Sequence, residues 1–564
     1  MKKVSCGYAV VQCLESEGVE MIFGQPGSHN LAIYDALRKS ESIRCINVKH
    51  EENAAVMADV YGRLTGKPGV CLTTAGPGAT NCITAIAQAY AARSPVIHIC
   101  GHCETTSVLP FHGLYDPNFL MNVFQPVTKE SFSVQRQSIV AEVFAEAFSV
   151  AQRGKKGPVH IEIPKDILEA ETEFDRYPRK EIPAGEVKTN SLLEAVRILR
   201  NARAPILLAS QGVTRDFASE QLIRLAEALS APVMTPWNGR SAIPFDHPLA
   251  FGFAISGGLG QFIHPTFKEI INESDAVVVV GSDPGEALYE FVKKHPVVIY
   301  LDHCEDTEPI QKVYPALILD GNIREILKLI LIELEGFRFQ DKAKERANKT
   351  IKVRNQIQKA VQEFIGRNKD PHHVGAILGE LNKVIREDAI VASDTGIIDS
   401  WMFPFFHSHW PHNLLTSGRY GSMGFALPAA IVSRLYFPER PVIALCGDGS
   451  FLMSSADFGT AVENGLKIIF VILNDKHFGT IRKMQDMFYH GRYYGTEILT
   501  PDFVQFAASY GVKGFSIDRF SEIGDVFEEA TLMDGPVVIN IHTDSQVPFF
   551  QLKKNNGKCK NLTL

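Results

Sequence analysis

The chain has 564 residues, of which 45% are hydrophobic and 21% are charged, and its formal net charge is -7. This length predicts roughly three to four domains. The acidic balance lacks the basic footprint of a nucleic-acid-binding protein, and no apolar run is long enough for a membrane span. We therefore expect a globular cytoplasmic protein with neither nucleic-acid nor membrane partners.

The first segment, residues 1–170, alternates helical and strand patterns. Helices are predicted over 6–18, 30–40, 52–66 and 82–94. Strands, some running into Gly-rich turns, are predicted over 21–27, 43–49, 69–81, 95–100 and 157–164. Alternation of this kind is typical of a mostly parallel sheet with helices on its faces.

The same pattern occurs twice more along the chain. Residues 171–190 are charged and contain prolines, which predicts a linker. A second segment, 190–335, has predicted strands over 204–210, 231–236, 275–281 and 297–302. A third, 371–545, has them over 389–396, 441–450, 467–475 and 535–542, and a tail covers 546–564. The predicted fold class is α/β, with three doubly wound parallel-sheet domains.

The most informative segment of the third domain reads "PVIALCGDGSFLM", followed after a predicted helix by "KIIFVILND". Both strands end at the same edge of a parallel sheet, so Asp448 and Asp475 can converge there. Two carboxylates beside a Gly-rich turn suit Mg²⁺ bound together with a phosphate group. The alternative is an ordinary strand–turn–helix in which the aspartate caps the helix.

The GDGS…ND spacing resembles the cofactor motif of thiamine diphosphate (ThDP) enzymes. That resemblance implies Mg²⁺ ligation by the side chains of Asp448 and Asp475 and by the backbone carbonyl of His477. Upstream, "TSGRYGSMGFALPAAI" is similar to the segment that holds the aminopyrimidine in acetolactate-synthase-like enzymes, and "SDTGIIDSW" to a diphosphate loop. The implied cofactor contacts are Gly396, Gly421, Ser422, Met423, Gly447, Gly449, Ser450, His477 and Phe478.

The first domain extends the resemblance over the whole chain. "FGQPGSHN", "KHEENAAVMADVYGRLTG", "TTAGPGATN" and "GPVHIEIPKD" follow the order expected of a pyrimidine-binding domain. A Glu at the position of Glu51 hydrogen-bonds the pyrimidine in such enzymes and so promotes removal of the thiazolium C2 proton, whereas Glu52 is assigned to dipole compensation. The implied contacts in this domain are Pro26, Gly27, Glu51, Pro77 and Asn81.

The group that the chain resembles includes acetolactate synthases, pyruvate oxidases and benzoylformate decarboxylase, and the overall pattern is nearest to acetolactate synthase. The resemblance implies a pyrimidine-binding domain (1–170), a central domain (190–335) and a diphosphate-binding domain (371–545). It also implies a homodimer or homotetramer with active sites at the subunit interface. The implied substrates are small 2-oxo acids or acyloins, which are joined after decarboxylation or cleaved.

The chain departs from acetolactate synthases where the substrate is chosen. Met484 stands where those enzymes have Trp, and Ile397 and Ile398 stand where they have Gln-His. The middle domain lacks the Gly-Met-His-Gly type stretch of FAD-containing members, and the Gly-rich stretch 255–262 is only a weak flavin signal. FAD therefore stays open but is not the favoured expectation. Acetolactate synthesis itself is therefore left open.

Three residues could act on the substrate directly. "FGQPGSHN" resembles the benzoylformate decarboxylase stretch in which a Ser contacts the substrate carboxylate, which suggests the same role for Ser28. His29 and His112 are candidate proton donors, because imidazoles titrate near working pH. Two alternatives remain: a 2-oxo acid decarboxylase that does not ligate, and a non-catalytic ThDP-binding paralogue.

Overall fold

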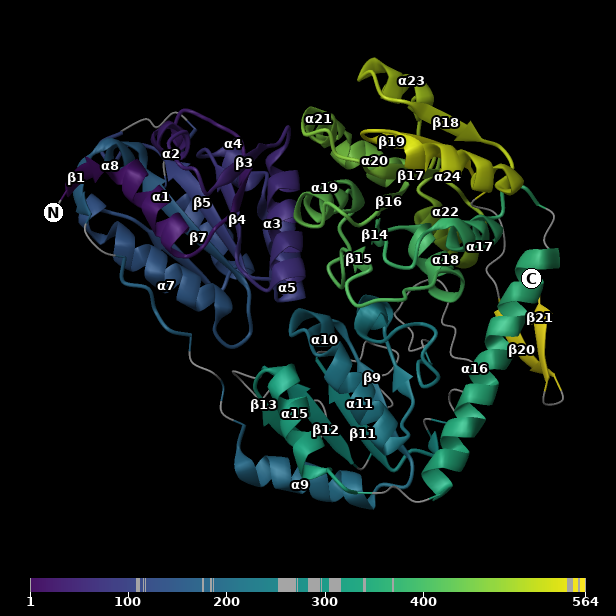
Figure 1. The fold of residues 1–564 in the computed structure, drawn as a ribbon. Helices are drawn as coiled ribbons and strands as arrows, with labels where there is room; N and C mark the ends of the chain where they lie inside the picture. Colours follow the sequence, from purple (N-terminus) through teal and green to yellow (C-terminus); the bar gives the residue numbers. More distant parts are fainter. Residues whose placement is uncertain are drawn as a thin grey trace. The chain divides into compact units, whose positions relative to one another are not determined.

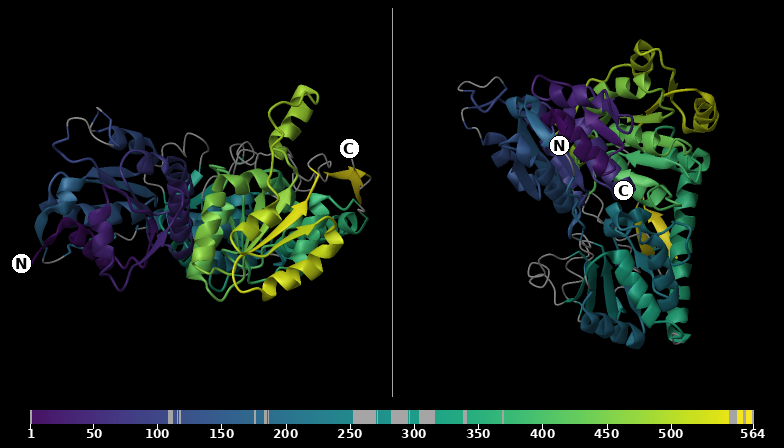
Figure 2. Two further views of the ribbon diagram at one scale, coloured as in Figure 1. Left: turned by 90° about the horizontal axis from the view of Figure 1, so that it is seen from above. Right: turned by 60° about the vertical axis from the view of Figure 1, so that its left-hand side comes forward.

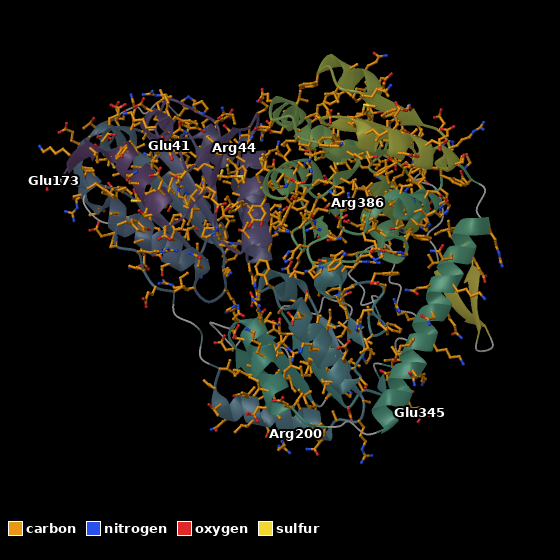
Figure 3. All side chains as sticks on the ribbon, viewed as in Figure 1. Glu41, Arg44, Glu173, Arg200, Glu345 and Arg386 are labelled. Atoms are coloured by element: carbon orange, nitrogen blue, oxygen red, sulfur yellow. The ribbon has the colours of Figure 1, made fainter. Side chains whose placement is uncertain are left out.

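The computed structural model contains three parallel sheets flanked by helices, which confirms the predicted α/β class (Figures 1 and 2). Side chains fill the space between sheets and helices (Figure 3). The residues described are 2–107, 112–114, 116, 118–174, 177–182, 185, 187–251, 270, 272–281, 295, 297–303, 316–337, 341–367, 370–544, 551–555 and 558–562.

The first sheet has the strand order β3-β2-β4-β5-β7-β6, with every pair parallel. Its strands are β2 (Met21–Gly24), β3 (Arg44–Asn47), β4 (Gly69–Thr73), β5 (Val96–His102), β6 (Glu130–Ser133) and β7 (Pro158–Pro164). Helices α1 (Cys6–Ser16), α2 (Leu31–Leu37) and α7 (Val140–Gln152) share one apolar core with this sheet. Helices α3 (Glu51–Thr65) and α5 (Ile83–Ala92) pack against each other, and α3 packs on β4.

The last sheet repeats this topology. Its order is β15-β14-β16-β17-β19-β18, again parallel throughout. The strands are β14 (Ile390–Ser393), β15 (Leu414–Thr416), β16 (Val442–Gly447), β17 (Ile469–Asn474), β18 (Gly514–Ile517) and β19 (Val537–His542). In both sheets the strand order reverses between the first strand along the chain and the third. Ligands of open α/β sheets bind at that point, outside the carboxyl ends of the strands.

The central sheet is smaller, with the order β10-β9-β11-β12-β13. It consists of β9 (Pro205–Ala209), β10 (Val233–Met234), β11 (Ala276–Val280), β12 (Val298–Asp302) and β13 (Ala316–Asp320). Helices α9 (Thr189–Asn201), α11 (Ser219–Leu229) and α15 (Ile323–Glu333) share its apolar core (Figure 1).

The chain divides into two compact units that do not follow the sequence order. One unit combines Met1–Pro183 with Ser417–Pro438 and Leu452–Leu466; the other contains Ala184–Thr416, Glu439–Phe451 and Lys467–Leu564. Within the first unit, α19 (Ala426–Tyr436) packs on α3. Asp457 accepts hydrogen bonds from the Asn53 side chain (2.6 Å) and the Lys49 backbone (2.8 Å). Arg44, labelled in Figure 3, donates to Asn464 at 2.8 Å. The three domain boundaries given above stay predictions.

Some elements differ from the sequence-based expectation. The predicted linker 171–190 begins with a strand, β8 (Glu171–Phe174), which pairs antiparallel with β1 (Lys2–Ser5). The short strands β6, β13, β15 and β18 were also not predicted, because three to five residues give little periodicity. In the predicted tail, β20 (Gln551–Asn555) and β21 (Lys558–Leu562) form an antiparallel pair.

Among the residues that the structure describes, no helix has both the length and the apolar character needed to cross a membrane.

Candidate functional site

Glu51 is the first residue of α3 and is buried, with 8% of its surface exposed. One carboxylate oxygen accepts a hydrogen bond from the Gln25 side-chain amide (2.6 Å), and the other accepts one from the Asn81 amide (2.9 Å). The two amides fix the direction of the carboxylate. Its neighbour Glu52 is half-buried, and burial raises the pKa of Glu52, although nearby His50 opposes this shift.

The turn after β2 contains the predicted Pro26 and Gly27 and is held by a buried asparagine. The Asn30 side chain accepts from the Gly27 backbone N–H (2.8 Å) and donates to the Gln25 carbonyl (3.2 Å). This asparagine therefore fixes the loop from which Gln25 reaches Glu51. Neither Gln25 nor Asn30 was predicted as a site residue, although both lie in the quoted stretch "FGQPGSHN".

The turn after β4 lies against the same carboxylate. It leads through Gly76, at φ +60°, into the short helix α4 (Pro77–Thr80), which precedes Asn81. A Cβ atom on Gly78 would lie 3.3 Å from a carboxylate oxygen of Glu51. The structure thus brings the carboxyl ends of β2 and β4 together around Glu51, at the point where the strand order reverses.

His29 and His112 meet at this edge of the sheet. Their rings contact edge to face, with centroids 5.7 Å apart. His29 is buried, and its Nδ1 lies 3.0 Å from the Ser28 hydroxyl and 3.2 Å from the Thr74 hydroxyl. The three residues predicted to act on substrate therefore form one cluster with Thr74, which was not predicted.

The segment Gly421–Met423 belongs to the same unit. Gly421 and Gly424 have φ angles of +73° and +84°, so each position favours glycine. The Ser422 hydroxyl donates to Gln88, whose amide donates to Asp59 on α3 at 2.8 Å. Asp59 and Gln88 are fully buried, so this chain of hydrogen bonds holds Ser422, directly before Met423.

In the second unit, Asp448 follows β16 and is 2% exposed. Its carboxylate accepts from the backbone N–H of Gly449 (2.8 Å) and of Lys476 (2.7 Å). Burial raises the pKa of Asp448 to about 6, and these two hydrogen bonds oppose the shift. The bond to Lys476 joins the turn after β16 to the turn after β17, as the parallel sheet predicts.

The turn after β17 is compact. The Asp475 carboxylate accepts from the His477 backbone N–H (3.0 Å), and a Cβ atom on Gly479 would lie 2.7 Å from the other carboxylate oxygen. A Cβ atom on Gly449 would lie 3.1 Å from the Phe478 ring. Phe478 therefore packs directly on the turn that contains Asp448.

The turn after β14 lies beside the turn after β16. The Ser450 hydroxyl donates to the Thr395 carbonyl at 3.1 Å, next to Gly396. No atom of the described residues lies within 4 Å of the position that a Cβ atom would take on Gly396, Gly421 or Gly447, leaving chain neighbours aside. These glycines leave room for a bound group to approach the backbone.

Comparison with known families accounts for most of the chain. The thiamine pyrophosphate (a synonym of ThDP) enzyme N-terminal TPP binding domain matches residues 5–130. The central domain of the same enzymes matches 192–330, and their C-terminal TPP binding domain matches 394–541.

Relatives that match over nearly the full length of the chain lead to the same kind of enzyme as the family comparison. A probable acetolactate synthase large subunit of Methanocaldococcus jannaschii is 32% identical over 95% of this chain and 91% of its own. An acetolactate synthase large subunit of Haemophilus influenzae is 31% identical, covering 100% and 99% of the two chains. The chain belongs to the thiamine pyrophosphate enzymes. The enzyme is similar to acetolactate synthase large subunits over its full length.

The residues present fit the cofactor that this family name implies. The enzyme's Glu51 offers one buried, oriented carboxylate, and open glycines line the turns after β14 and β16. Asp448 and Asp475 are hard oxygen donors on adjoining turns, the type that Mg²⁺ prefers. Burial of Asp448 without a cation is costly, and a bound divalent ion would offset that cost.

Among the described residues at the carboxyl edge of the central sheet, the side chains and backbone give no comparable fit for a flavin. At its carboxyl edge the buried Arg215 pairs with Asp216 (2.9 Å) and Asp302 (2.7 Å). A Cβ atom on Gly212 would lie 2.4 Å from the Gly281 backbone. The Gly-rich stretch 255–262, the weak flavin signal, lies outside the described residues.

Proposed function

We propose that the enzyme uses ThDP and Mg²⁺ to make or break a carbon–carbon bond next to the carbonyl of a 2-oxo acid. The observation that carries this proposal is the buried Glu51 carboxylate, held by Gln25 and Asn81. A carboxylate fixed by two donors in a largely dry site keeps one direction and can share a proton with a neighbouring group. Burying a carboxylate costs desolvation free energy, which an ordinary, exposed helix-capping glutamate avoids. A role toward the cofactor explains why Glu51 is buried despite this cost.

Each cluster then has a role in holding the cofactor. When bound, ThDP supplies the nucleophile and accepts the electrons released with CO₂. Glu51 would hold a proton at the pyrimidine ring, and Gly421 and Met423 would bind the same ring. Asp448 and Asp475, with the His477 carbonyl, would hold Mg²⁺ and with it the diphosphate.

The Ser28, His29 and His112 cluster would contact the substrate. The Ser28 hydroxyl is exposed and is suited to a carboxylate, while the two imidazoles can give or take a proton. The close pair of imidazoles favours the second candidate function, a decarboxylase that protonates its intermediate and releases an aldehyde. Acetolactate-synthase-like ligation, or its reverse, remains the first candidate because relatives of that name match the full chain.

A substrate panel tests the proposal and separates the candidates. The enzyme freed of cofactor by chelation and dialysis is assayed with pyruvate, longer aliphatic 2-oxo acids and aromatic ones. We expect CO₂ release only when both ThDP and Mg²⁺ are restored. An acyloin or a 2-hydroxy-3-oxo acid product supports ligation, and aldehyde alone supports the decarboxylase. No turnover of any 2-oxo acid or acyloin, with ThDP bound, would support the non-catalytic paralogue instead.

We also propose a homodimer or homotetramer. Helix α22 (Gly479–Tyr489), directly after Asp475, exposes a run of large apolar side chains: Ile481, Met484, Met487, Phe488 and Tyr489. A patch of this kind next to a site marks an interaction surface. Light scattering after size-exclusion chromatography measures the assembly, and a monomer at micromolar concentration would contradict it.

We finally propose that the reaction does not need FAD. The support is the ion-paired edge of the central sheet described above. The purified enzyme should show no flavin absorbance in the visible spectrum and should keep full activity without added flavin.

A further inference from the structure

Thr74, the residue after β4, contacts His29 at two points. Its hydroxyl accepts the backbone N–H of His29 (3.4 Å) and lies 3.2 Å from the ring Nδ1. The Ser28 hydroxyl lies 3.0 Å from the same nitrogen. Because both hydroxyls contact Nδ1, proton exchange between His29 and a substrate would take place at Nε2.

Close packing holds Thr74 in place. A Cβ atom on Gly27 would lie 2.5 Å from the Thr74 Cβ, and one on Gly78 would lie 2.8 Å from its methyl group. Such distances do not occur between real side chains, so both positions require glycine for the threonine to fit. The Cys100 thiol also donates to the Thr74 carbonyl at 3.4 Å.

Packing restrains His29 as well. A Cβ atom on Gly101, in β5, would lie 2.3 Å from the His29 carbonyl oxygen and 2.9 Å from its Cβ. His29 therefore rests on β5 on one side and on Thr74 on another, while its ring meets His112. A ring restrained in this way has its orientation set by the hydrogen bonds at Nδ1.

We propose that Thr74 is the positioning residue for His29: its hydroxyl fixes the ring orientation and tautomer with which His29 transfers a proton at the substrate. This inference rests on the proposed function, which makes His29 the proton-transferring group. Thr74 itself does not touch the reacting atoms, so its effect passes through His29 alone.

The adjacent Thr73 provides a matched control. Its hydroxyl also contacts an imidazole, at 3.0 Å from Nε2 of His98, and both residues are fully buried. The two threonines are neighbours on one chain segment and make the same type of bond. Only the Thr74 bond leads to the cluster beside Glu51.

The first experiment compares Thr74→Val, Thr74→Ser and Thr73→Val in the holoenzyme, with the substrate found in the panel. Thr74→Val should lower kcat about tenfold and change the pH profile of kcat, because general acid–base catalysis depends on the placement of the proton donor. Thr74→Ser, which keeps the hydroxyl, and Thr73→Val should stay within about threefold of the native rate with the native profile. His29→Gln combined with Thr74→Val should be no slower than His29→Gln alone.

The second experiment does not depend on turnover, so it separates failure of this inference from failure of the proposed function. Deuterium exchange at the C2–H of each histidine, followed by mass spectrometry over pH, reports the titration of individual rings. Thr74→Val should move the midpoint at His29 by about half a pH unit or more, and Thr74→Ser should restore it. The groups facing His29 that also titrate are His112, Cys100 and, beyond Gly78, Glu51, and all are left unchanged.

Three outcomes overturn the inference. One is an unchanged His29 midpoint in Thr74→Val. Another is a loss of activity in Thr74→Ser equal to that in Thr74→Val, which would mean that the methyl packing matters and the hydroxyl does not. The third is a parallel loss of kcat in Thr73→Val, which would indicate a general effect on the sheet. If Thr74→Val does not fold, Thr74→Ser still tests the inference: because this variant keeps the hydroxyl, a shifted His29 midpoint or a clear loss of kcat in it would overturn the proposal.

Discussion

Replacing Glu51 by glutamine removes the negative charge and keeps the size of the side chain nearly unchanged. In the native chain, both carboxylate oxygens of Glu51 accept an amide hydrogen bond, from Gln25 at 2.6 Å and from Asn81 at 2.9 Å. A glutamine offers one oxygen and one NH₂ group, so it can satisfy only one of these donors unless a neighbouring amide turns over. The variant therefore loses its proton-sharing carboxylate, and one of the two amide donors is left without an acceptor on residue 51.

Two magnitudes follow from this geometry. A lost acid–base group lowers turnover by about 10²–10⁴-fold. A buried donor left unsatisfied costs about 1–3 kcal/mol of folding free energy, which is too little to unfold a domain of ordinary stability. We thus expect Glu51→Gln to fold, to bind ThDP and Mg²⁺, and to turn over at least about 100-fold more slowly.

The assay measures steady-state CO₂ release and, separately, ThDP affinity by calorimetry. Glu52→Gln is the matched control, because Glu52 lies in the same helical turn and is half-buried, and it should stay within about threefold of the native rate. If Glu51→Gln keeps a third or more of the native turnover, the proposed role of this carboxylate is wrong. An equal loss in Glu52→Gln would point to the helix as a whole.

Three further predictions concern other parts of the chain. Asp448→Asn should raise the Mg²⁺ concentration for half-maximal activity by about 10-fold or more, measured by titrating metal into the chelated enzyme, because it removes one hard ligand charge; an unchanged requirement would place the metal elsewhere. Burial lowers the pKa of His98 to about 3 from its ordinary 6.5, so the folded chain takes up this proton only at a lower pH than the unfolded chain does. Stability from this group is complete above about pH 6.5 and falls as the pH drops toward 3, by about 2 kcal/mol at pH 5. Urea unfolding at pH 7 and pH 5 should show this difference in the native chain and less of it in His98→Gln. Arg215→Met removes the guanidinium that pairs with the buried Asp216 and Asp302 and should cost about 3–5 kcal/mol, seen as an earlier first transition in urea; a change below about 1 kcal/mol would mean that water reaches this edge of the central sheet.

The order of helices and strands followed from local pattern for the long elements. Helix α3 runs from Glu51 to Thr65 and is capped by Gly66, whose φ of +73° is the left-handed conformation that a glycine favours. Strands such as β9 and β11 are buried on both faces and read as continuous apolar runs in the sequence. Short edge strands and β8 depend on pairing with a partner far along the chain, and residue pattern does not reveal that partner.

The site residues likewise separate into those that the sequence pattern could place and those that it could not. Asp448 and Asp475 could be placed together because parallel strands end at one edge, and the Lys476 backbone does bridge their turns. Gln25 and Thr74 could not be assigned, since their roles consist of contacts with Glu51 and His29 that cross from one strand end to another. Asn30 acts only through the loop that it holds around Gln25. Their residue types are common in turns and give no separate signal.

The sequence alone determined the three α/β segments, the family resemblance and the residue types needed at the cofactor. These depend on local periodicity and on motifs of fixed spacing, both of which are visible in the sequence without the fold. Tertiary structure decided how the chemistry is arranged: Glu51 buried between two amides, Ser28, His29 and His112 in one cluster, and the Thr74 hydroxyl beside Nδ1 of His29. Direction, burial and hydrogen-bond partners arise only when strand ends from distant parts of the chain meet, so no local pattern can specify them.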